Sequence, residues 1–305
     1  MIKSKTNNRK LITIVGPTAS GKSELAVKLA KKFNGEVISA DSRQVYKKID
    51  IGTGKITKKE MKGIPHHLLD VAPPKNRFTV VQYRKLTLKA INKTFKKHKV
   101  PILCGGTGFY IQAVIDGIVI PEIRPDWELR KKLEKKSVKE LYRTLKKLDS
   151  KRVKTIEKKN PRRLIRAIEI AKKIGRVPDL KKEPLPYPVL IIGVKKNKKE
   201  LENLIKKRFF KWLKQGFLKE VLKLRNPPAD KGLSWQRIEE FGIHYRTAAQ
   251  YLQNKITEKE MLEKSMIELR NYAKRQMTWF KRDKRIHWVK SQKKAEKLAK
   301  EFLAN

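Results

Sequence analysis

Short apolar runs alternate with amphipathic segments over the first 120 residues. The apolar runs at 11–15 (LITIV), 36–40 (EVISA) and 101–104 (PILC) have the length of buried strands. Between them, residues 25–33 and 79–97 place apolar side chains at helical spacing, and the second segment begins on a threonine that can cap a helix. Strands that alternate with helices in this way predict a parallel sheet flanked by helices.

The pattern changes from about residue 121. Residues 124–183 contain 23 Lys or Arg against 9 Asp or Glu, a local net charge of +14, and no good strand. Helical patterns cover 138–148 and 162–174. A stiff run, PLPYP, then leads into VLIIGV at 189–194, which suits a buried parallel strand. The predicted domains are a discontinuous core, residues 1–120 and 184–305, and a basic all-helical insertion, residues 121–183.

The last third of the chain is mostly helical by pattern. Long patterned segments cover 201–224 and 259–281, and IHWV at 286–289 is typical of a closing strand. The core is therefore predicted to take up its sheet again after the insertion.

A phosphate-binding loop follows the first strand. Residues 16–23 (GPTASGKS) match the pattern G-x-x-x-x-G-K-[ST]. Glycines at both ends allow successive backbone amides to converge on one anion, and the following helix adds its positive end. A chance glycine loop is the alternative, but the strand before it and the helix after it argue against chance. The predicted fold class is α/β, with a P-loop NTPase-like sheet. The loop predicts a polyphosphate site formed by Gly16, Pro17, Thr18, Ala19, Ser20, Gly21, Lys22 and Ser23, with the Ser23 hydroxyl as the predicted Mg²⁺ ligand.

The charge of the chain favours a polyanionic partner. Its 77 Lys and Arg exceed its 30 Asp and Glu, for a formal net charge of +47. A lysine-rich genome could account for part of this excess. Three insertion arginines at one-turn spacing favour contact with nucleic acid over a solvated basic face; they are Arg162, Arg163 and Arg166.

The remaining composition narrows the class of protein. The single cysteine, Cys104, excludes an internal disulfide and a cysteine-rich zinc site. No apolar run approaches the roughly 20 residues that a membrane-spanning helix needs. The polar N-terminus runs directly into the first strand, so we expect no signal peptide and a soluble cytoplasmic protein.

Polar residues at the ends of the predicted strands are functional candidates, because ligands bind at the carboxyl ends of parallel strands. The second strand is followed by Asp41, Ser42, Arg43 and Gln44. The third ends in glycines and Thr107, without an acidic residue for Mg²⁺, which weighs against ATP hydrolysis. The adjacent His66 and His67 would point to opposite faces of a strand, so we expect hydrogen-bonded histidines in a turn and not metal ligands.

The ordered set of motifs resembles the bacterial-type tRNA dimethylallyltransferases, the IPP transferase family. The motifs are GPTASGKS (16–23), ISADSRQVYKKIDIGTGK (38–55), GIPHHLLDV (63–71), CGGTGFYIQAVIDG (104–117), NPRRLIRAIEI (160–170) and YAKRQMTWFKRDKRIHW (272–288). The resemblance implies transfer of a dimethylallyl group from its diphosphate to N6 of adenosine 37 of tRNA. Two segments depart from the family pattern. Many relatives have Gln where this chain has Arg162, and the expected Gly-Tyr pair is altered within 241–245.

The resemblance also implies roles for single residues. Asp41 would be the general base, Thr107 would orient the adenine amine, and Arg275 would reach the diphosphate. From the residues alone, Asp41 could instead cap a helix or hold Mg²⁺ through water, and Arg275 could be an exposed helix arginine. The implied tRNA contacts are Asp41, Ser42, Arg43, Gln44 and Thr107 near the target base, and Arg130, Arg162, Arg163 and Arg166 on the anticodon stem-loop.

The implied partners are tRNA and dimethylallyl diphosphate, with Mg²⁺ as cofactor, and we expect a monomer. Two other functions stay open at this point. A small-molecule P-loop kinase would use ATP, with Asp41 as the base toward an acceptor hydroxyl. A non-catalytic RNA-binding P-loop protein would bind tRNA without altering it.

Overall fold

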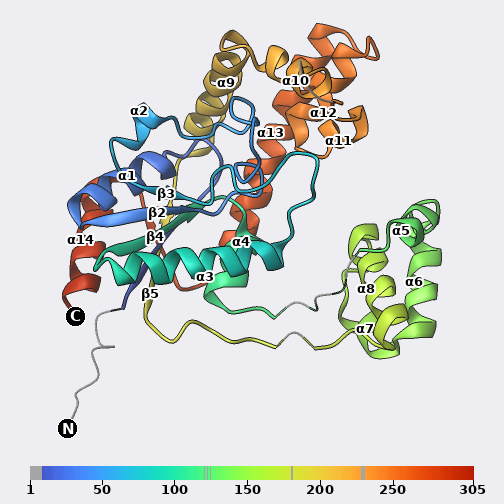
Figure 1. The fold of residues 1–305 in the computed structure, drawn as a ribbon, viewed down its shortest axis with the longest axis horizontal. Helices are drawn as coiled ribbons and strands as arrows, with labels where there is room; N and C mark the ends of the chain where they lie inside the picture. Colours follow the sequence, from blue (N-terminus) through green and yellow to red (C-terminus); the bar gives the residue numbers. More distant parts are fainter. Residues whose placement is uncertain (1–8, 120, 122, 124, 180, 228–230) are drawn as a thin grey trace. The chain divides into compact units, whose positions relative to one another are not determined.

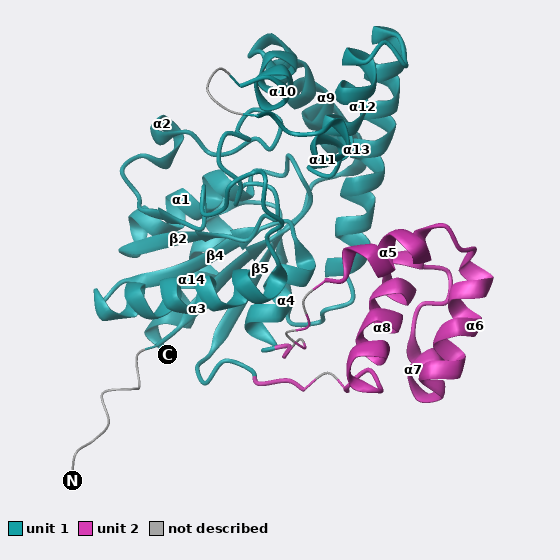
Figure 2. Cartoon of the chain, turned by 45° about the vertical axis from the view of Figure 1, so that its right-hand side comes forward, with its two compact units in different colours: residues 1–117, 184–305 teal, residues 118–183 magenta. Residues whose placement is uncertain are grey.

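A computed structural model of the chain describes residues 9–119, 121, 123, 125–179, 181–227 and 231–305 (Figure 1). The chain divides into two compact units, shown in different colours in Figure 2. One unit is Met1–Gly117 with Pro184–Asn305, and the other is Ile118–Glu183. The boundary that we predicted at residue 120 lies outside the described residues.

The first unit contains a six-stranded sheet in which every pair of neighbouring strands is parallel. Its order is β3 (His66–His67), β2 (Gly35–Ser39), β4 (Val100–Gly105), β1 (Leu11–Val15), β5 (Val189–Val194) and β6 (Ile286–Val289). β1 lies between β4 and β5, where Ile12 is in register with Ile102 and Leu190. The carboxyl ends of β1, β2 and β4 therefore meet at one edge of the sheet. The predicted parallel sheet flanked by helices is confirmed.

Alternate residues of β1 serve the two faces of the sheet, as the period of two along a strand requires. Ile12 and Ile14 pack with the helices α1 (Lys22–Lys32) and α14 (Gln292–Ala304). Leu11 and Val15 belong to the opposite core, which includes side chains of α3 (Val80–Lys96) and α4 (Gly108–Ile115). Because both faces are covered, the central strands are almost wholly buried. The start of α3 is fixed by a capping box between Thr79 and Gln82, which confirms the predicted cap.

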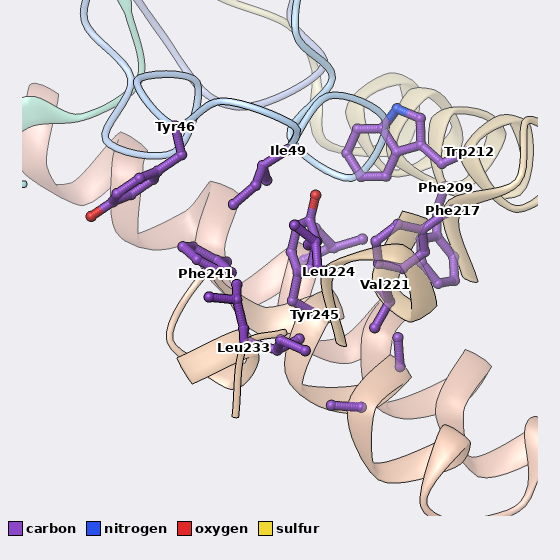
Figure 3. Packing of buried hydrophobic residues seen from close by; sticks show 14 of the residues in the cluster. Tyr46, Ile49, Phe209, Trp212, Phe217, Val221, Leu224, Leu233, Phe241 and Tyr245 are labelled. Carbon is purple, nitrogen blue, oxygen red and sulfur yellow. The ribbon is translucent and has the colours of Figure 1, made fainter. Parts of the chain in front are cut away.

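The C-terminal helices build a third core cluster, rich in aromatic side chains (Figure 3). These helices are α9 (Lys198–Lys214), α10 (Phe217–Arg225), α11 (Trp235–Glu239), α12 (Ile243–Leu252) and α13 (Glu258–Phe280). Tyr46 and Ile49, from the segment after β2, pack into the same cluster. The patterned segment 201–224 is two helices and not one, because the chain turns at Gly216, whose φ is +92°. The cluster ties the segment after β2 to the C-terminal helices.

The second unit is helical, as its pattern predicted. Its helices are α5 (Trp127–Glu134), α6 (Val138–Leu148), α7 (Ser150–Thr155) and α8 (Pro161–Ile174). Leucines and isoleucines of α5, α6 and α8 form its core. Along the part of the chain that the structure describes, in either unit, no helix is long and apolar enough to cross a membrane.

Glu36 of β2 is a fully buried carboxylate among cationic and polar partners. It accepts hydrogen bonds from Lys97 Nζ at 2.9 Å, from Lys99 Nζ at 3.2 Å and from His67 Nε2 at 2.7 Å. His66 Nδ1 bonds the carbonyl of Ile64 at 2.8 Å. The two histidines are hydrogen-bonded as predicted, but they form the short strand β3 where we expected a turn. No group of three His, Cys, Asp or Glu within the described ranges could hold a metal ion.

We expect Glu36→Gln to lower the free energy of unfolding at pH 7 by about 2 kcal/mol, because a buried network loses its acceptor charge. Burial by itself would raise the pKa of Glu36, but the bonds from Lys97, His67 and Lys99 outweigh it and hold that pKa at about 2. The ordinary pKa is 4.5. The contribution of Glu36 is therefore complete above pH 4.5 and is lost as the pH falls toward 2.

Chemical denaturation at pH 7 and at pH 3 measures this effect. Glu301→Gln is the control, because Glu301 pairs with Lys297 on the surface at 3.8 Å, where such a pair contributes about 0.5 kcal/mol or less. Equal unfolding midpoints for the Glu36 variant and the wild type at pH 7 would contradict the prediction.

Candidate active site

The phosphate-binding loop joins β1 to α1 and has the backbone that an anion site needs. Gly16 has φ +147° and Gly21 has φ +89°, both in the region that favours glycine. A Cβ on Gly16 would lie 2.8 Å from the carbonyl oxygen of Val194, so a larger residue would also displace β5. No side chain caps the start of α1. The first amides of that helix are therefore available to an anion.

Two side chains of the loop are prepared for a polar ligand. Lys22 Nζ donates to the carbonyl of Pro17 at 2.5 Å. Burial, together with the charge of Arg208, lowers the pKa of Lys22 to about 8, although Cys104 and Asp41 act in the opposite direction. Ser20 is almost fully buried, and its hydroxyl has no hydrogen-bond partner among the described residues. An anion in the loop would stabilise the charged form of Lys22.

Gln276 of α13 braces the loop, and sequence reasoning missed it. Its Oε1 accepts from the amide of Thr18 at 2.8 Å, and its Nε2 donates to the carbonyl of Gly106 at 2.9 Å. One buried side chain thus links the phosphate loop to the segment after β4. Its one sequence signal was its place beside Arg275 in the motif YAKRQ.

Asp41 stands at the carboxyl end of β2 and caps the turn that follows. Its Oδ1 accepts from the amide of Arg43 at 2.8 Å and more weakly from that of Gln44 at 3.4 Å. The second oxygen, Oδ2, has no hydrogen bond with the residues that the structure describes. The negative charge of Asp41 acts to raise the pKa of Lys22 and of Tyr272, so the carboxylate lies in the same electrostatic environment as both. Oδ1 of Asp41 therefore caps the turn, while Oδ2 remains available to accept a hydrogen bond from a ligand.

Thr107 connects the end of β4 to the turn after Asp41. Its Oγ1 accepts from the amide of Ser42 at 3.0 Å, and its own amide donates to the carbonyl of Ala40 at 3.1 Å. The two strand ends approach so closely that a Cβ on Gly105 would lie 2.1 Å from the oxygen of Ala40. The glycines before Thr107 thus permit the contact that brings two predicted site residues together.

Two arginines of the C-terminal helices, Arg275 and Arg208, differ in their surroundings. Arg275 on α13 is exposed and makes no hydrogen bond or ion pair with a described residue. Arg208 on α9 was not predicted. Burial lowers its pKa, the charges of Asp41 and Glu60 raise it, and its Nη2 donates to the carbonyl of Gly54 at 3.2 Å. Arg208 is therefore a second partly buried cation near Lys22, supplied by a helix whose Lys-rich sequence gave no local signal.

The predicted tRNA contacts of the second unit fall into two groups. Arg130 donates two hydrogen bonds to buried Glu169, at 2.9 and 2.7 Å, and Arg166 also pairs with Glu169. Arg162 and Arg163 are exposed; the second pairs with Glu157 at 3.1 Å, and both partners are half-exposed. The structure thus gives Arg130 and Arg166 a part in the fold of the unit, and leaves Arg162 and Arg163 open to solvent. The tRNA contacts of all four stay predictions.

A glycine loop with a partly buried lysine, at the carboxyl edge of a parallel sheet, defines the class: this is an α/β protein with a P-loop NTPase-like fold. Comparison with known proteins narrows the class. The family described as IPP transferase matches residues 44–283. The tRNA dimethylallyltransferase of Acetivibrio thermocellus is 38% identical over 288 residues, which cover 92% of this chain and 91% of that protein. The tRNA dimethylallyltransferase of Halothermothrix orenii is 37% identical over 314 residues, which cover 97% of this chain and 94% of that protein.

Solved structures that resemble this chain carry the same kind of name as these relatives. The crystal structure of the full-length tRNA isopentenylpyrophosphate transferase from Bacillus halodurans has a TM-score of 0.72 and 35% identity, and 97% of each chain is covered. A eukaryotic dimethylallyltransferase acting on tRNA has a TM-score of 0.77 and 27% identity, over 96% of this chain and 77% of the other. The chain belongs to the IPP transferase family. The predicted family is confirmed, and the alternative of a small-molecule kinase is not favoured.

Proposed function

We propose that this protein transfers the dimethylallyl group of dimethylallyl diphosphate to N6 of adenosine 37 in tRNA. The observation that carries the proposal is the position of Asp41, a carboxylate with one available oxygen, in the electrostatic environment of the phosphate-loop lysine Lys22. The diphosphate leaves and the amine attacks at the same carbon. Lys22, which would bind the diphosphate, and Asp41, which would take the amine proton, must therefore both lie near that carbon. The names of the relatives support the reaction.

The phosphate loop would bind the diphosphate of the donor. The amides of residues 16–23, with Lys22 and Arg208, would neutralise the charge that develops as the allylic C–O bond breaks. Ser23 would hold Mg²⁺, and the fit is good because this ion binds through one or two protein oxygens while phosphates and waters complete its shell. When bound, Mg²⁺ supplies further positive charge to the leaving group. Arg275 would reach the diphosphate from α13.

The acceptor half of the reaction depends on Asp41 and Thr107. The lone pair of N6 forms a bond to the allylic carbon, the C–O bond breaks, and its electrons leave with the diphosphate. One proton of the amine passes to Asp41, which restores electron density to a nitrogen otherwise delocalised into the ring. Thr107 would orient the amine by hydrogen bonding. The adenine must leave its stack to reach these groups, and Ser42, Arg43 and Gln44 would contact its neighbours.

The basic helical unit would hold the backbone of the anticodon stem-loop. All proposed catalytic residues come from one chain, so a monomer would suffice, and we propose that it acts in the cytoplasm.

We expect Arg163→Ala to weaken tRNA binding several-fold at low salt and to reduce the slope of log K against log salt by about one, because one phosphate contact is lost. Filter binding at three salt concentrations measures the slope. Lys297→Ala, at an exposed surface pair on α14, is the control, and a slope unchanged by Arg163→Ala would contradict the contact.

The reaction itself is tested by locating the transferred group. The protein is incubated with an anticodon stem-loop RNA, dimethylallyl diphosphate and Mg²⁺, and the RNA is then digested to nucleosides for mass spectrometry. We expect one dimethylallyladenosine per RNA, and none when guanosine replaces adenosine 37. Modification of a different nucleoside, or equal modification of both RNAs, would contradict the proposal.

A further inference from the structure

Residues 50–54, which we call the 50–54 loop, hold two side chains of the candidate active site. The carbonyl of Gly54 accepts from Arg208 Nη2 at 3.2 Å and from Gln44 Nε2 at 3.2 Å. The carbonyl of Thr53 accepts from the same Gln44 nitrogen at 3.3 Å. The loop therefore helps to position Arg208, a partly buried cation, and Gln44, a predicted tRNA contact.

The opposite side of the 50–54 loop is bound by one carboxylate, Glu220 of α10. Its Oε2 accepts from the amides of Asp50 at 2.8 Å and Ile51 at 2.7 Å, and its Oε1 accepts from the amide of Gly52 at 3.1 Å. Tyr245 adds its hydroxyl to Oε1 at 2.6 Å. Three successive amides that converge on one anion form a nest. An acceptor with two charged oxygens is what four such donors require.

The segment that departs from the family pattern adds to this attachment. His244 Nε2 contacts the carbonyl of Gly52, and Tyr245 is the hydroxyl donor to Glu220. Burial lowers the pKa of His244 to about 4, so its imidazole is neutral near pH 7, and Nε2 must carry the proton because a carbonyl only accepts. In Figure 3 the hydroxyl of Tyr245 points toward the chain segment that carries Ile49. The altered residues at 241–245 thus hold the 50–54 loop from the same side as Glu220.

Packing leaves the 50–54 loop little room to shift. A Cβ on Gly52 would lie 2.4 Å from Phe217 and 2.6 Å from Tyr245. Gly54 has φ +56°, and a Cβ there would lie 1.8 Å from Nη2 of Arg208. A shift of the loop would therefore move the carbonyl of Gly54 that accepts from Arg208.

We propose that Glu220 is a positioning residue for the donor site: by binding the amides of the 50–54 loop, it places the guanidinium of Arg208 where it acts on the diphosphate. Glu220 acts through the loop and touches no substrate. The inference rests on the proposed function, because it assigns Arg208 to the donor diphosphate.

The first test measures binding of inorganic pyrophosphate, with Mg²⁺, to the full-length protein by calorimetry. We expect Glu220→Gln to weaken binding at least tenfold, because a neutral amide cannot satisfy all four donors. Glu220→Asp keeps the charge on a shorter stem and should recover part of the loss. Glu200→Gln is the matched control; Glu200 pairs with Lys196 at 2.6 Å on the surface of α9, so its affinity should equal that of the wild type.

A double-mutant cycle separates positioning from a general structural role. If Glu220 acts through Arg208, Glu220→Gln should change pyrophosphate affinity less than twofold in a protein that already carries Arg208→Ala. A full tenfold loss in that background would overturn the proposal, as would normal binding by the single Glu220→Gln variant. A purely structural role predicts a lower melting temperature with normal affinity in the folded fraction, which also overturns it.

Gly54→Ala keeps the test decisive if Glu220→Gln does not fold. It leaves Glu220 intact, but the added methyl group at position 54 would displace the guanidinium of Arg208 directly. It should therefore weaken pyrophosphate binding to a similar extent. Normal affinity for this variant would overturn the link between loop and guanidinium. The same proteins are assayed for transfer to RNA. Failure of the wild type to modify RNA contradicts the proposed function, whereas normal transfer by both wild type and Glu220→Gln contradicts the positioning role alone.

Discussion

Asp41→Asn is expected to lower the rate of transfer to tRNA by about a thousandfold, within the range that a general base contributes. The asparagine keeps a side-chain oxygen where Oδ1 accepts from the amides of Arg43 and Gln44, so the turn after β2 should stay intact. What the variant loses is the basic oxygen that would take the N6 proton. Single-turnover transfer measured with saturating donor and RNA reports the chemical step.

The binding of pyrophosphate should change little in Asp41→Asn, because the phosphate loop keeps its amides and Lys22. Asp70→Asn is the matched control, since Asp70 is a partly exposed carboxylate of the same unit that pairs with Lys55 at 2.6 Å. A transfer rate within tenfold of the wild type for Asp41→Asn would show that another group removes the proton.

Lys22→Met is expected to weaken pyrophosphate binding at least a hundredfold. Its ammonium is partly buried at the proposed anion site, where a lower dielectric makes a charge pair stronger than on the surface. Lys28→Met is the control on the same helix, because Lys28 lies in a surface pair with Glu24 at 2.6 Å. Calorimetry of the two variants compares the lysine of the phosphate loop with a lysine six positions along the same helix; equal affinities would contradict the role of Lys22.

The pKa of Lys22 adds a pH signature to this prediction. Burial lowers that pKa from 10.5 to about 8, so the free protein loses the ammonium proton as the pH rises through 8. Only the charged form attracts the anion, and affinity should therefore decline above pH 8, by at most about tenfold per pH unit. Lys22→Arg keeps its charge in this range, so the decline that belongs to Lys22 should be absent from its profile.

The sequence predicted the local features of the molecule and missed contacts between distant segments. The strand at 11–15, the glycines of the phosphate loop and the cap at Thr79 each have a signal within a few residues, namely apolar run, spacing or capping pair. Gln276 and Arg208 have no such signal. Each reaches the site across more than 150 residues of chain, through packing that no local pattern encodes.

In the insertion, charge and spacing alone do not show which arginines pair within the fold and which face solvent. The arginine spacing placed Arg166 with Arg162 and Arg163 as a phosphate-binding group. In the folded unit, Arg166 and Arg130 lie against Glu169, a carboxylate whose exposed fraction is 2%. A buried acid needs paired cations, and one glutamate three residues after Arg166 could not be recognised as buried from the sequence. The helix break at Gly216 was missed because the apolar pattern continues on both sides of it.

In the proposed reaction, the phosphate loop holds an isoprenoid diphosphate whose allylic carbon is passed to RNA. The most direct measurement gives the wild-type protein an anticodon stem-loop RNA, dimethylallyl diphosphate, ATP and Mg²⁺ in one reaction, followed by intact-mass analysis of the RNA and of the nucleotides. We expect the RNA to gain one C5H8 unit, one pyrophosphate to be released for each, and the ATP to remain whole. Unchanged RNA with ADP formed, or RNA that gains a phosphate, would contradict the account.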